Sequence, residues 1–132
     1  MTRYYAIDAA NRQLAELRPL LERLRADRDE VARLQDELTA FRQADGSADH
    51  ARDLADREAA IRTVVQRMKR TVTQLDDWSV ALRDISSGLV DFPALVNGRP
   101  IWLCWRLGED GIGWWHELET GVAGRKSLIE LA

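Results

Sequence analysis

The sequence has little of several residue types, and each scarcity excludes a class of protein. Its 132 residues include one cysteine and three prolines. One cysteine cannot form a disulfide within the chain, which fits the reducing cytoplasm, where we expect the protein to reside. No apolar run reaches the roughly 18 residues that span a bilayer, and the first residues lack the apolar segment of a signal peptide. We therefore expect no membrane partner.

The chain also lacks an excess of basic residues. Lysine and arginine number 19 against 22 aspartates and glutamates, which gives a formal net charge of -3. Nucleic-acid binding normally requires a basic surface that displaces counterions from the phosphates, so we expect no nucleic-acid partner. With 45% hydrophobic and 31% charged residues, the composition is that of a folded globular protein. Its length predicts a single domain over 1–132.

Glycine is almost missing from the first part of the chain, where Gly46 stands alone among residues 1–86. Apolar residues recur there mostly at intervals of three, four or seven, over 7–42 and again over 49–86. That spacing places them along one side of an α-helix, so we expect two long amphipathic helices. The polar residues around Gly46 predict a turn between them.

A short turn makes two consecutive helices run antiparallel, and each of these helices presents an apolar stripe. We therefore expect a long, coiled-coil-like hairpin in which the stripes face each other. Pro19 lacks a backbone donor and should kink the first helix locally. Ala6, directly before that helix, offers no side-chain oxygen that could cap it.

Residues 88–132 hold the other seven glycines and two of the three prolines, which predicts strands and turns. Asn97-Gly98 between apolar runs is typical of a two-residue hairpin, because both turn positions favour positive φ. A second turn at 108–112 completes a three-stranded antiparallel β-meander over 89–118, and the predicted fold class is α+β. The strands should span 89–96, 99–107 and 112–118. Residues 119–132 form a tail in which 127–131 can be a short strand or helical turn.

A three-residue second loop would place Cys104 directly opposite His116 on one face of the sheet, with Arg106 opposite Trp114. Cysteine and histidine are ligands of transition metals, and Glu117 can add an oxygen. One hypothesis is therefore a divalent metal such as Zn²⁺ at Cys104, His116 and Glu117. Two alternatives remain open. His116 can deprotonate Cys104 to give a nucleophilic thiolate, or Cys104 is a buried apolar residue and His116 a hydrogen-bonding one.

Four of the five tryptophans lie between Trp102 and Trp115. Large aromatic side chains can pack a small sheet against helices, or they can form a surface for a flat or apolar ligand or a partner protein. The sequence has no phosphate-binding glycine loop, CxxC, HExxH or nucleophile elbow, so we assign no catalytic residue.

The segments "RYYAIDAANRQLAELRPLLERLR" and "GLVDFPALVNGRPIWLCWRLGEDGIGWWHELETGVAGRKSL" resemble the bacterial DUF2203 family, a group of small proteins of unknown function. The C-terminal segment carries the more specific part of the match. The resemblance implies one domain with a helical hairpin and a small sheet, and it assigns no activity. It also implies that Cys104, His116, Glu117 and five further polar residues belong to one pattern. Together with two tryptophans, these five are the predicted ligand-binding residues: Asp91, Arg99, Trp102, Arg106, Glu109, Trp114 and Arg125.

The long apolar stripes and the lack of a complete catalytic set favour a non-enzymatic interaction module. Such a protein would self-associate or bind a partner protein through its helices, because a long thin hairpin buries little surface alone. The second hypothesis is a small metal- or ligand-binding domain centred on Cys104 and His116. The third is a cysteine-dependent enzyme.

Overall fold

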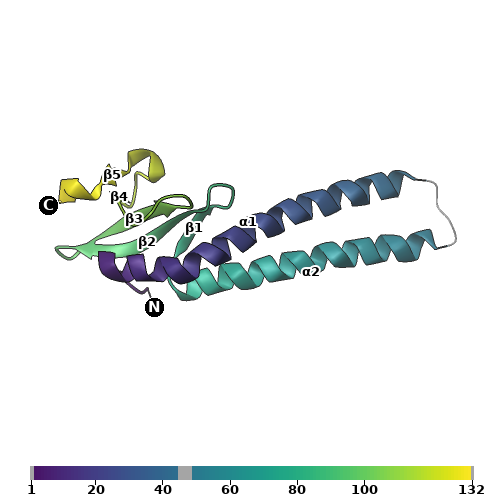
Figure 1. Ribbon diagram of the computed structural model, residues 1–132, viewed down its shortest axis with the longest axis horizontal. Coiled ribbons are helices and arrows are strands. Elements are labelled where there is room, and N and C mark those ends of the chain that lie inside the picture. Colours follow the sequence, from purple (N-terminus) through teal and green to yellow (C-terminus); the bar gives the residue numbers. More distant parts are fainter. Residues whose placement is uncertain (1, 45–48, 132) are drawn as a thin grey trace.

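Two long helices form an antiparallel hairpin that extends far beyond the rest of the molecule (Figure 1). The structure is a computed structural model that describes residues 2–44 and 49–131. Helix α1 spans Ile7–Gln43 and helix α2 spans His50–Asp77. The predicted α+β fold with a helical hairpin is confirmed. In the predicted turn, residues 45–48 lie outside the described residues.

Helix α1 buries one stripe of apolar side chains along its first half. The stripe consists of Ala10, Leu14, Leu17, Leu21 and Leu24. Their alternating spacing of four and three residues keeps them on one side of the helix, as the sequence predicted. Ala6 precedes the helix in an extended conformation and makes no side-chain cap. Neither α1 nor α2, nor any shorter helix in the described part of the chain, has the length and apolar content of a bilayer-crossing segment.

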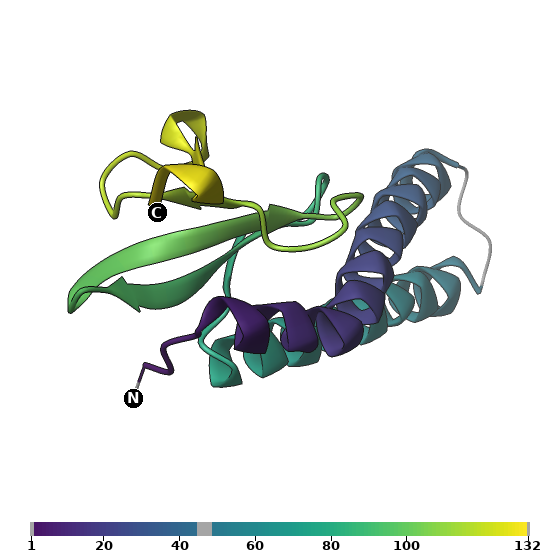
Figure 2. The same ribbon diagram turned by 60° about the vertical axis from the view of Figure 1, so that its left-hand side comes forward.

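Pro19 lies inside α1 at an exposed position. Figure 2 shows that the axis of α1 changes direction within its first half, the part that contains Pro19. A proline has no N–H to donate to the preceding turn and its ring crowds the carbonyl there, which bends a helix at that point. The bend matches the predicted local kink and lets the rest of α1 follow α2 away from the sheet.

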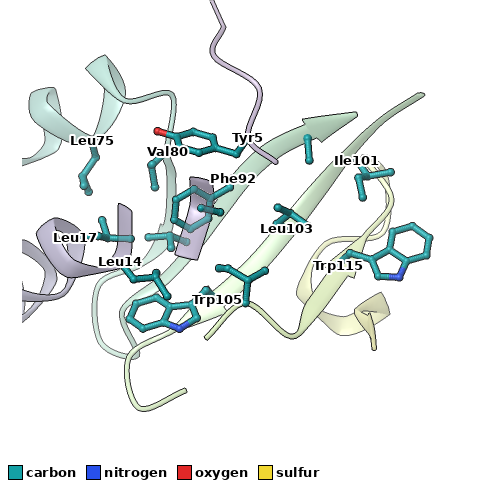
Figure 3. Close-up of a cluster of buried hydrophobic side chains, with 14 of the residues drawn as sticks. Tyr5, Leu14, Leu17, Leu75, Val80, Phe92, Ile101, Leu103, Trp105 and Trp115 are labelled. Atoms are coloured by element: carbon teal, nitrogen blue, oxygen red, sulfur yellow. The ribbon is translucent and has the colours of Figure 1, made fainter. Parts of the chain in front are cut away.

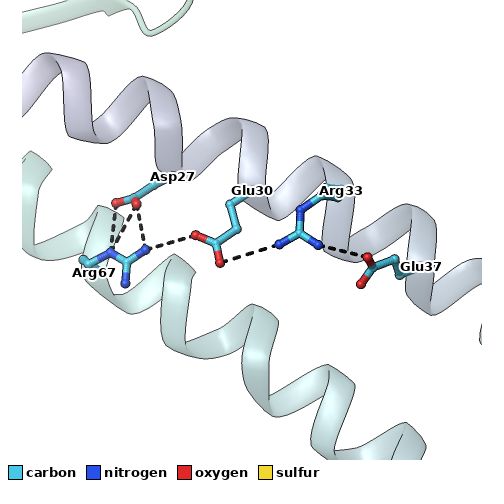
Figure 4. Close-up of polar contacts among 5 residues, drawn as sticks. All are labelled: Asp27, Glu30, Arg33, Glu37 and Arg67. Atoms are coloured by element: carbon cyan, nitrogen blue, oxygen red, sulfur yellow. Dashed lines mark hydrogen bonds and ion pairs between the residues drawn. The ribbon is translucent and has the colours of Figure 1, made fainter.

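Beyond the sheet, a polar network joins the two helices (Figure 4). The guanidinium of Arg67 in α2 binds both carboxylate oxygens of the buried Asp27 in α1, with Nη2 2.7 Å from Oδ1. Arg67 also contacts Glu30 at 3.3 Å, and Arg33 extends the chain of charges to Glu37. The forked geometry fixes the two helices side by side at this level, because a bidentate pair tolerates little sliding.

The sheet has five antiparallel strands in sequence order rather than the predicted three. The strands are β1 Ala81–Asp84, β2 Leu89–Val96, β3 Arg99–Arg106, β4 Trp114–His116 and β5 Lys126–Ser127. Asn97 and Gly98 join β2 to β3 with φ values of 52° and 78°, as expected for their hairpin turn. Two short 3-10 helices, Val122–Gly124 and Leu128–Leu131, lie before and after β5.

The predicted extent of the second helix, to residue 86, is wrong. Helix α2 ends at Asp77, and Ser79 follows with a φ of 60°, which turns the chain back towards the sheet. Residues 81–84 then pair with β2, where Leu82 lies opposite Val90. Pairing with the open edge of β2 satisfies backbone groups that a longer helix would leave unpaired at that edge. The spacing of apolar residues in this segment suits either structure.

The core lies between the helical hairpin and one face of the sheet, and Figure 3 shows part of it. We call this face the inner face and the opposite one the outer face. Leu14 and Leu17 from α1 meet Phe92 from β2 and Trp105 from β3. The chain before α1 joins in, because the backbone N–H of Tyr5 donates to Pro93 and the Tyr5 ring packs edge-on against Phe92. The other buried members are Ala10, Leu21, Leu75, Val80, Val90, Ala94, Ile101, Leu103, Ile112 and Trp115.

Candidate metal centre

The outer face of the sheet carries the candidate functional site. Side chains alternate between the two faces of a strand, so Val90 and Phe92 enter the core while Asp91 between them points outward. Cys104 on β3 is the direct cross-strand partner of Asp91, and both residues are buried. Strand β4 adds His116 to the same face.

The pairing of β3 with β4 differs from the predicted register by two residues. Cys104 lies opposite Trp114 rather than His116, and His116 lies opposite Trp102. The prediction that Cys104 and His116 share a face nevertheless holds, because side chains repeat with a period of two. The two residues are diagonal neighbours instead of direct partners. The predicted pairing of Arg106 with Trp114 is wrong for the same reason.

Side-chain contacts explain why the connection between β3 and β4 is longer than predicted. Oε1 of Glu109 accepts a hydrogen bond from the backbone N–H of Arg106 at 3.0 Å. The backbone N–H of Ile112 donates to Oδ1 of Asn11 in α1 at 2.8 Å. These backbone groups are bound by side chains and not by a partner strand, so β4 begins only at Trp114.

Asp91, Cys104 and His116 form a compact group of metal-ligand side chains. One donor atom from each lies within 4.8 Å of the donor atoms of the other two. The residues are 2%, 0% and 2% exposed, respectively. A carboxylate, a thiolate and an imidazole together suit Zn²⁺ and neighbouring transition metals. Cys104 and His116, the cysteine and histidine ligands considered from the sequence, thus lie close together, and Asp91 is the third member of the group.

Hydrogen bonds hold the His116 ring in a fixed orientation. Nδ1 lies 2.7 Å from the backbone oxygen of Glu117, and Nε2 lies 2.9 Å from Oδ2 of Asp91. A carbonyl oxygen can only accept, so Nδ1 donates its proton to Glu117. Nε2 and the carboxylate oxygen would then both be acceptors, and their close approach requires a proton or a metal ion between them. A ring nitrogen that donates to a backbone carbonyl is the usual arrangement in metal-ligating histidines.

Asp91 lies at the centre of the group and is incompletely hydrogen-bonded. Its Oδ2 accepts a hydrogen bond from Nε of Arg83 at 2.8 Å, in addition to the contact with His116. Its other oxygen, Oδ1, is buried without a hydrogen-bond partner in residues 2–44 and 49–131. A buried carboxylate oxygen without a partner is destabilising, and a bound cation would remove that cost.

Burial raises the pKa of the Cys104 thiol above its ordinary value, although the hydrogen bond from Arg125 opposes the shift. Nη1 of Arg125 lies 3.9 Å from the sulfur. Both ring nitrogens of His116 face oxygen atoms, so neither is positioned to accept the thiol proton. The geometry therefore gives no support to a cysteine nucleophile. A divalent metal would hold the sulfur as a thiolate and release its proton.

The side chain of Glu117, the third metal ligand predicted from the sequence, pairs with Arg99 at 2.9 Å instead of joining the group. It contributes its backbone oxygen to His116. Asp91, which we predicted only as a ligand-binding residue, occupies the place expected for the glutamate. Its contact with His116 depends on how three strands pair, and sequence spacing alone does not specify that.

The remaining predicted ligand-binding residues are not members of the metal-ligand group. Arg125 pairs with Glu109 at 2.8 Å and lies over the ring of Trp114 at 4.3 Å. The Nε of Arg106 is buried without a hydrogen-bond partner among the described residues. The guanidinium of Arg83 lies over the ring of Trp102, with Cζ 4.9 Å from the ring centre.

Arg83 is a functional candidate that the sequence analysis missed. It lies in β1, a strand that we had assigned to the second helix, and there it reaches Asp91. Its side chain is 44% exposed, whereas that of Asp91 is 3% exposed, so one end of the pair reaches solvent. The sequence contains no separate sign of this strand, because the spacing of apolar residues around Leu82 also suits a helix.

An open pocket of about 350 Å³ adjoins the centre. Asp91 and His116 form part of its wall, together with Arg83. The segment that follows β4, residues 118–122, also lines the pocket. The pocket therefore connects two of the three metal-ligand side chains with solvent.

Comparison with protein families gives a match over most of the chain. The model of the family described as "Uncharacterized conserved protein (DUF2203)" matches residues 3–128. The match covers both helices and all five strands, and it includes every residue of the candidate centre. A search of curated proteins and a search of solved structures each returned no match.

Proposed function

The chain belongs to the DUF2203 family, and we propose that it is a metal-binding protein that holds a divalent transition metal at Asp91, Cys104 and His116. The observation that carries the proposal is the convergence of three buried donor side chains of suitable chemistry. The unpaired Oδ1 of Asp91 supports it independently, because a cation would satisfy this oxygen. We rank this function above interaction through the helices, which the sequence alone favoured.

The ligand types favour zinc over the alkaline-earth metals. Thiolate sulfur and imidazole nitrogen bind Zn²⁺ well, whereas Mg²⁺ and Ca²⁺ prefer shells made of oxygen. Three protein ligands leave one position of a tetrahedral ion for water or another ligand. The carbonyl of Glu117 would keep the His116 ring directed at the ion, and Arg83 would hold Asp91 from the other side.

Zinc binding to the chelator-treated, full-length protein tests the proposal. Elemental analysis after dialysis should give one zinc per chain, and competition with a chromophoric chelator should give its affinity. Cys104→Ser and His116→Gln should each weaken binding by more than about tenfold, because each removes a ligand. Folding of each variant is checked by circular dichroism.

Glu117→Gln is the matched control. It removes the carboxylate that the sequence nominated as a ligand but keeps the backbone oxygen that binds His116. We expect its zinc affinity to stay close to that of the parent protein. If the folded parent binds no stoichiometric zinc, or if Cys104→Ser and His116→Gln bind it as tightly as the parent, the group is only a buried polar cluster and the proposal fails.

An apolar groove on the hairpin supports a second function, self-association through the helices. The groove has a volume of about 570 Å³ and is lined mainly by Leu24, Val31, Val65, Met68, Val72 and Ile85. Within the 28-residue α2, the buried residues are Val64, Thr71 and Leu75. Helices in proteins are stabilised mainly by packing of their apolar side, and three buried residues are few for a helix of this length. We therefore propose that a second copy of the hairpin covers the groove.

Sedimentation equilibrium tests self-association. The parent should sediment as a dimer at micromolar concentration, and Met68→Glu should sediment as a monomer, because it places a charge in the groove. Gln66→Glu is the control, since Gln66 is exposed on the same helix and does not line the groove. A monomeric parent at high micromolar concentration contradicts this second proposal.

A further inference from the structure

The pocket beside the metal centre has a wall of mixed chemistry. Asp91 and His116 provide two of the proposed metal ligands on one side. Leu89, Leu118 and Val122 provide apolar surface, and the last two are exposed large hydrophobic residues. Exposed apolar side chains at the mouth of a pocket favour a ligand with an apolar part.

Arg83 is held in place beside the centre by two contacts. Its Nε donates to Oδ2 of Asp91 at 2.8 Å, and its Cζ lies over Trp102, 4.9 Å from the ring centre. Among the described residues, the hydrogen bond and ion pair of Arg83 are both made through Nε, and its Nη atoms make none. Since the side chain is 44% exposed and lines the pocket, these donors are available to a bound molecule. A guanidinium edge binds the two oxygens of a carboxylate particularly well.

The charges around the pocket favour a singly charged anion. The thiolate of Cys104 and the carboxylate of Asp91 would cancel the charge of a divalent ion, which leaves the positive charge of Arg83 at the site. Glu119 also lines the pocket and is exposed, so a multiply charged anion such as phosphate would be repelled more strongly. The single positive charge of Arg83 can pair with the single negative charge of a monocarboxylate, whereas a second negative charge on the ligand would have no cationic partner among the described residues of the pocket wall.

From this geometry we infer that the pocket binds a small aliphatic monocarboxylate. One carboxylate oxygen occupies the fourth position of the metal, the guanidinium of Arg83 binds the carboxylate, and the short alkyl chain contacts Leu118 and Val122. The inference rests on the proposed metal site, because the ion supplies one of the two contacts. It adds to that proposal a class of ligand and a role for Arg83 in selecting it.

Cobalt-loaded, full-length protein provides the test, because Co²⁺ at a zinc site absorbs visible light and its spectrum reports the coordination shell. Titration with butyrate should change the visible bands with saturation. Acetate should act at higher concentration, since it lacks the alkyl contacts, and the neutral butyramide should have no effect. Phosphate distinguishes a general anion site, and a stronger response to phosphate than to butyrate overturns the inference.

Two variants separate the contacts. Arg83→Gln, measured at saturating Co²⁺, should weaken butyrate binding by about tenfold or more, because a charged hydrogen bond is lost. Leu118→Ser should remove the preference for butyrate over acetate and leave acetate binding unchanged. Bands that appear with Co²⁺ but do not respond to carboxylates overturn this inference and leave the metal site standing. If no bands characteristic of a thiolate-ligated ion appear, the metal site and the inference both fail.

Discussion

The two faces of the sheet are formed by the same strands but are stabilised differently. On the inner face, each side chain of β2 and β3 gains by leaving water, and its contribution depends little on any one neighbour. On the outer face, Asp91 and His116 are equally buried, yet each needs a specific partner for its polar atoms. Burial therefore stabilises the fold on the inner face. On the outer face it leaves polar and charged atoms that need a partner, and a bound cation can be that partner.

The largest effect should come from the inner face. Phe92→Ala should lower the free energy of unfolding by about 3–5 kcal/mol, because it leaves a cavity where an aromatic ring packs against Tyr5. Urea denaturation of the metal-free protein measures the change. Leu95→Ala, in the same strand but half exposed, should cost less than about 1 kcal/mol. Similar losses for both variants would remove the distinction between buried and exposed positions of β2.

On the outer face, Asp91→Ala should cost about 1–3 kcal/mol in the metal-free protein, because His116 and Arg83 lose their common acceptor. The loss should be smaller than that of Phe92→Ala, since Arg83 can turn to solvent. Adding zinc should raise the thermal midpoint of the parent but not that of the variant, because only the parent binds the ion. Equal stabilisation of both proteins by zinc would show that Asp91 is not a ligand.

A smaller effect should come from a residue that links the two faces. Asn11 in α1 binds the backbone of Ile112 and so helps to set where β4 begins. Asn11→Ala should cost about 1 kcal/mol of stability. Because a displaced β4 would move His116 relative to Asp91, we also expect zinc affinity to fall several-fold in competition assays. Unchanged zinc affinity would mean that strand pairing alone fixes the register.

The smallest expected effect is on the pH dependence of stability and comes from Tyr5, which packs against the inner face. Burial raises the pKa of Tyr5 in the folded protein, and its hydroxyl donates to the carbonyl of Trp78 at 2.6 Å. The folded state then keeps a proton that the unfolded state releases above about pH 10, so stability falls as pH rises beyond that value. Tyr5→Phe should lack this part of the alkaline loss. Parallel urea midpoints for the two proteins between pH 9 and pH 11 would contradict the prediction.

Local patterns were sufficient to predict much of the fold. The helical stripes of 7–42 depend on spacing within one segment, and the Asn97-Gly98 turn depends on two adjacent residues. The shared face of Cys104 and His116 was also predictable. It requires only that the residue opposite His116 lie an even number of positions from Cys104 along β3. These features are decided by neighbours in the chain.

The features that were missed depend on residues far apart in sequence. The register of β4 involves Asn11, and the third member of the metal-ligand group, Asp91, comes from a strand that precedes His116 by 25 positions. The end of α2 depends on the open edge of β2, because residues 81–84 pair with that edge. The spacing of their apolar side chains would also permit a helix. Sequence spacing within one segment carries no information about such partners.

All five tryptophans lie at one end of the molecule, with Trp78 at the end of α2 and the others in β3 and β4. Intrinsic fluorescence therefore reports on the sheet, whereas far-ultraviolet dichroism is dominated by the two helices. The distant part of the hairpin can open without a change in emission, so the two optical signals together distinguish fraying of the helices from loss of the whole structure. The placement of its aromatic residues thus gives this protein separate built-in probes for its two ends.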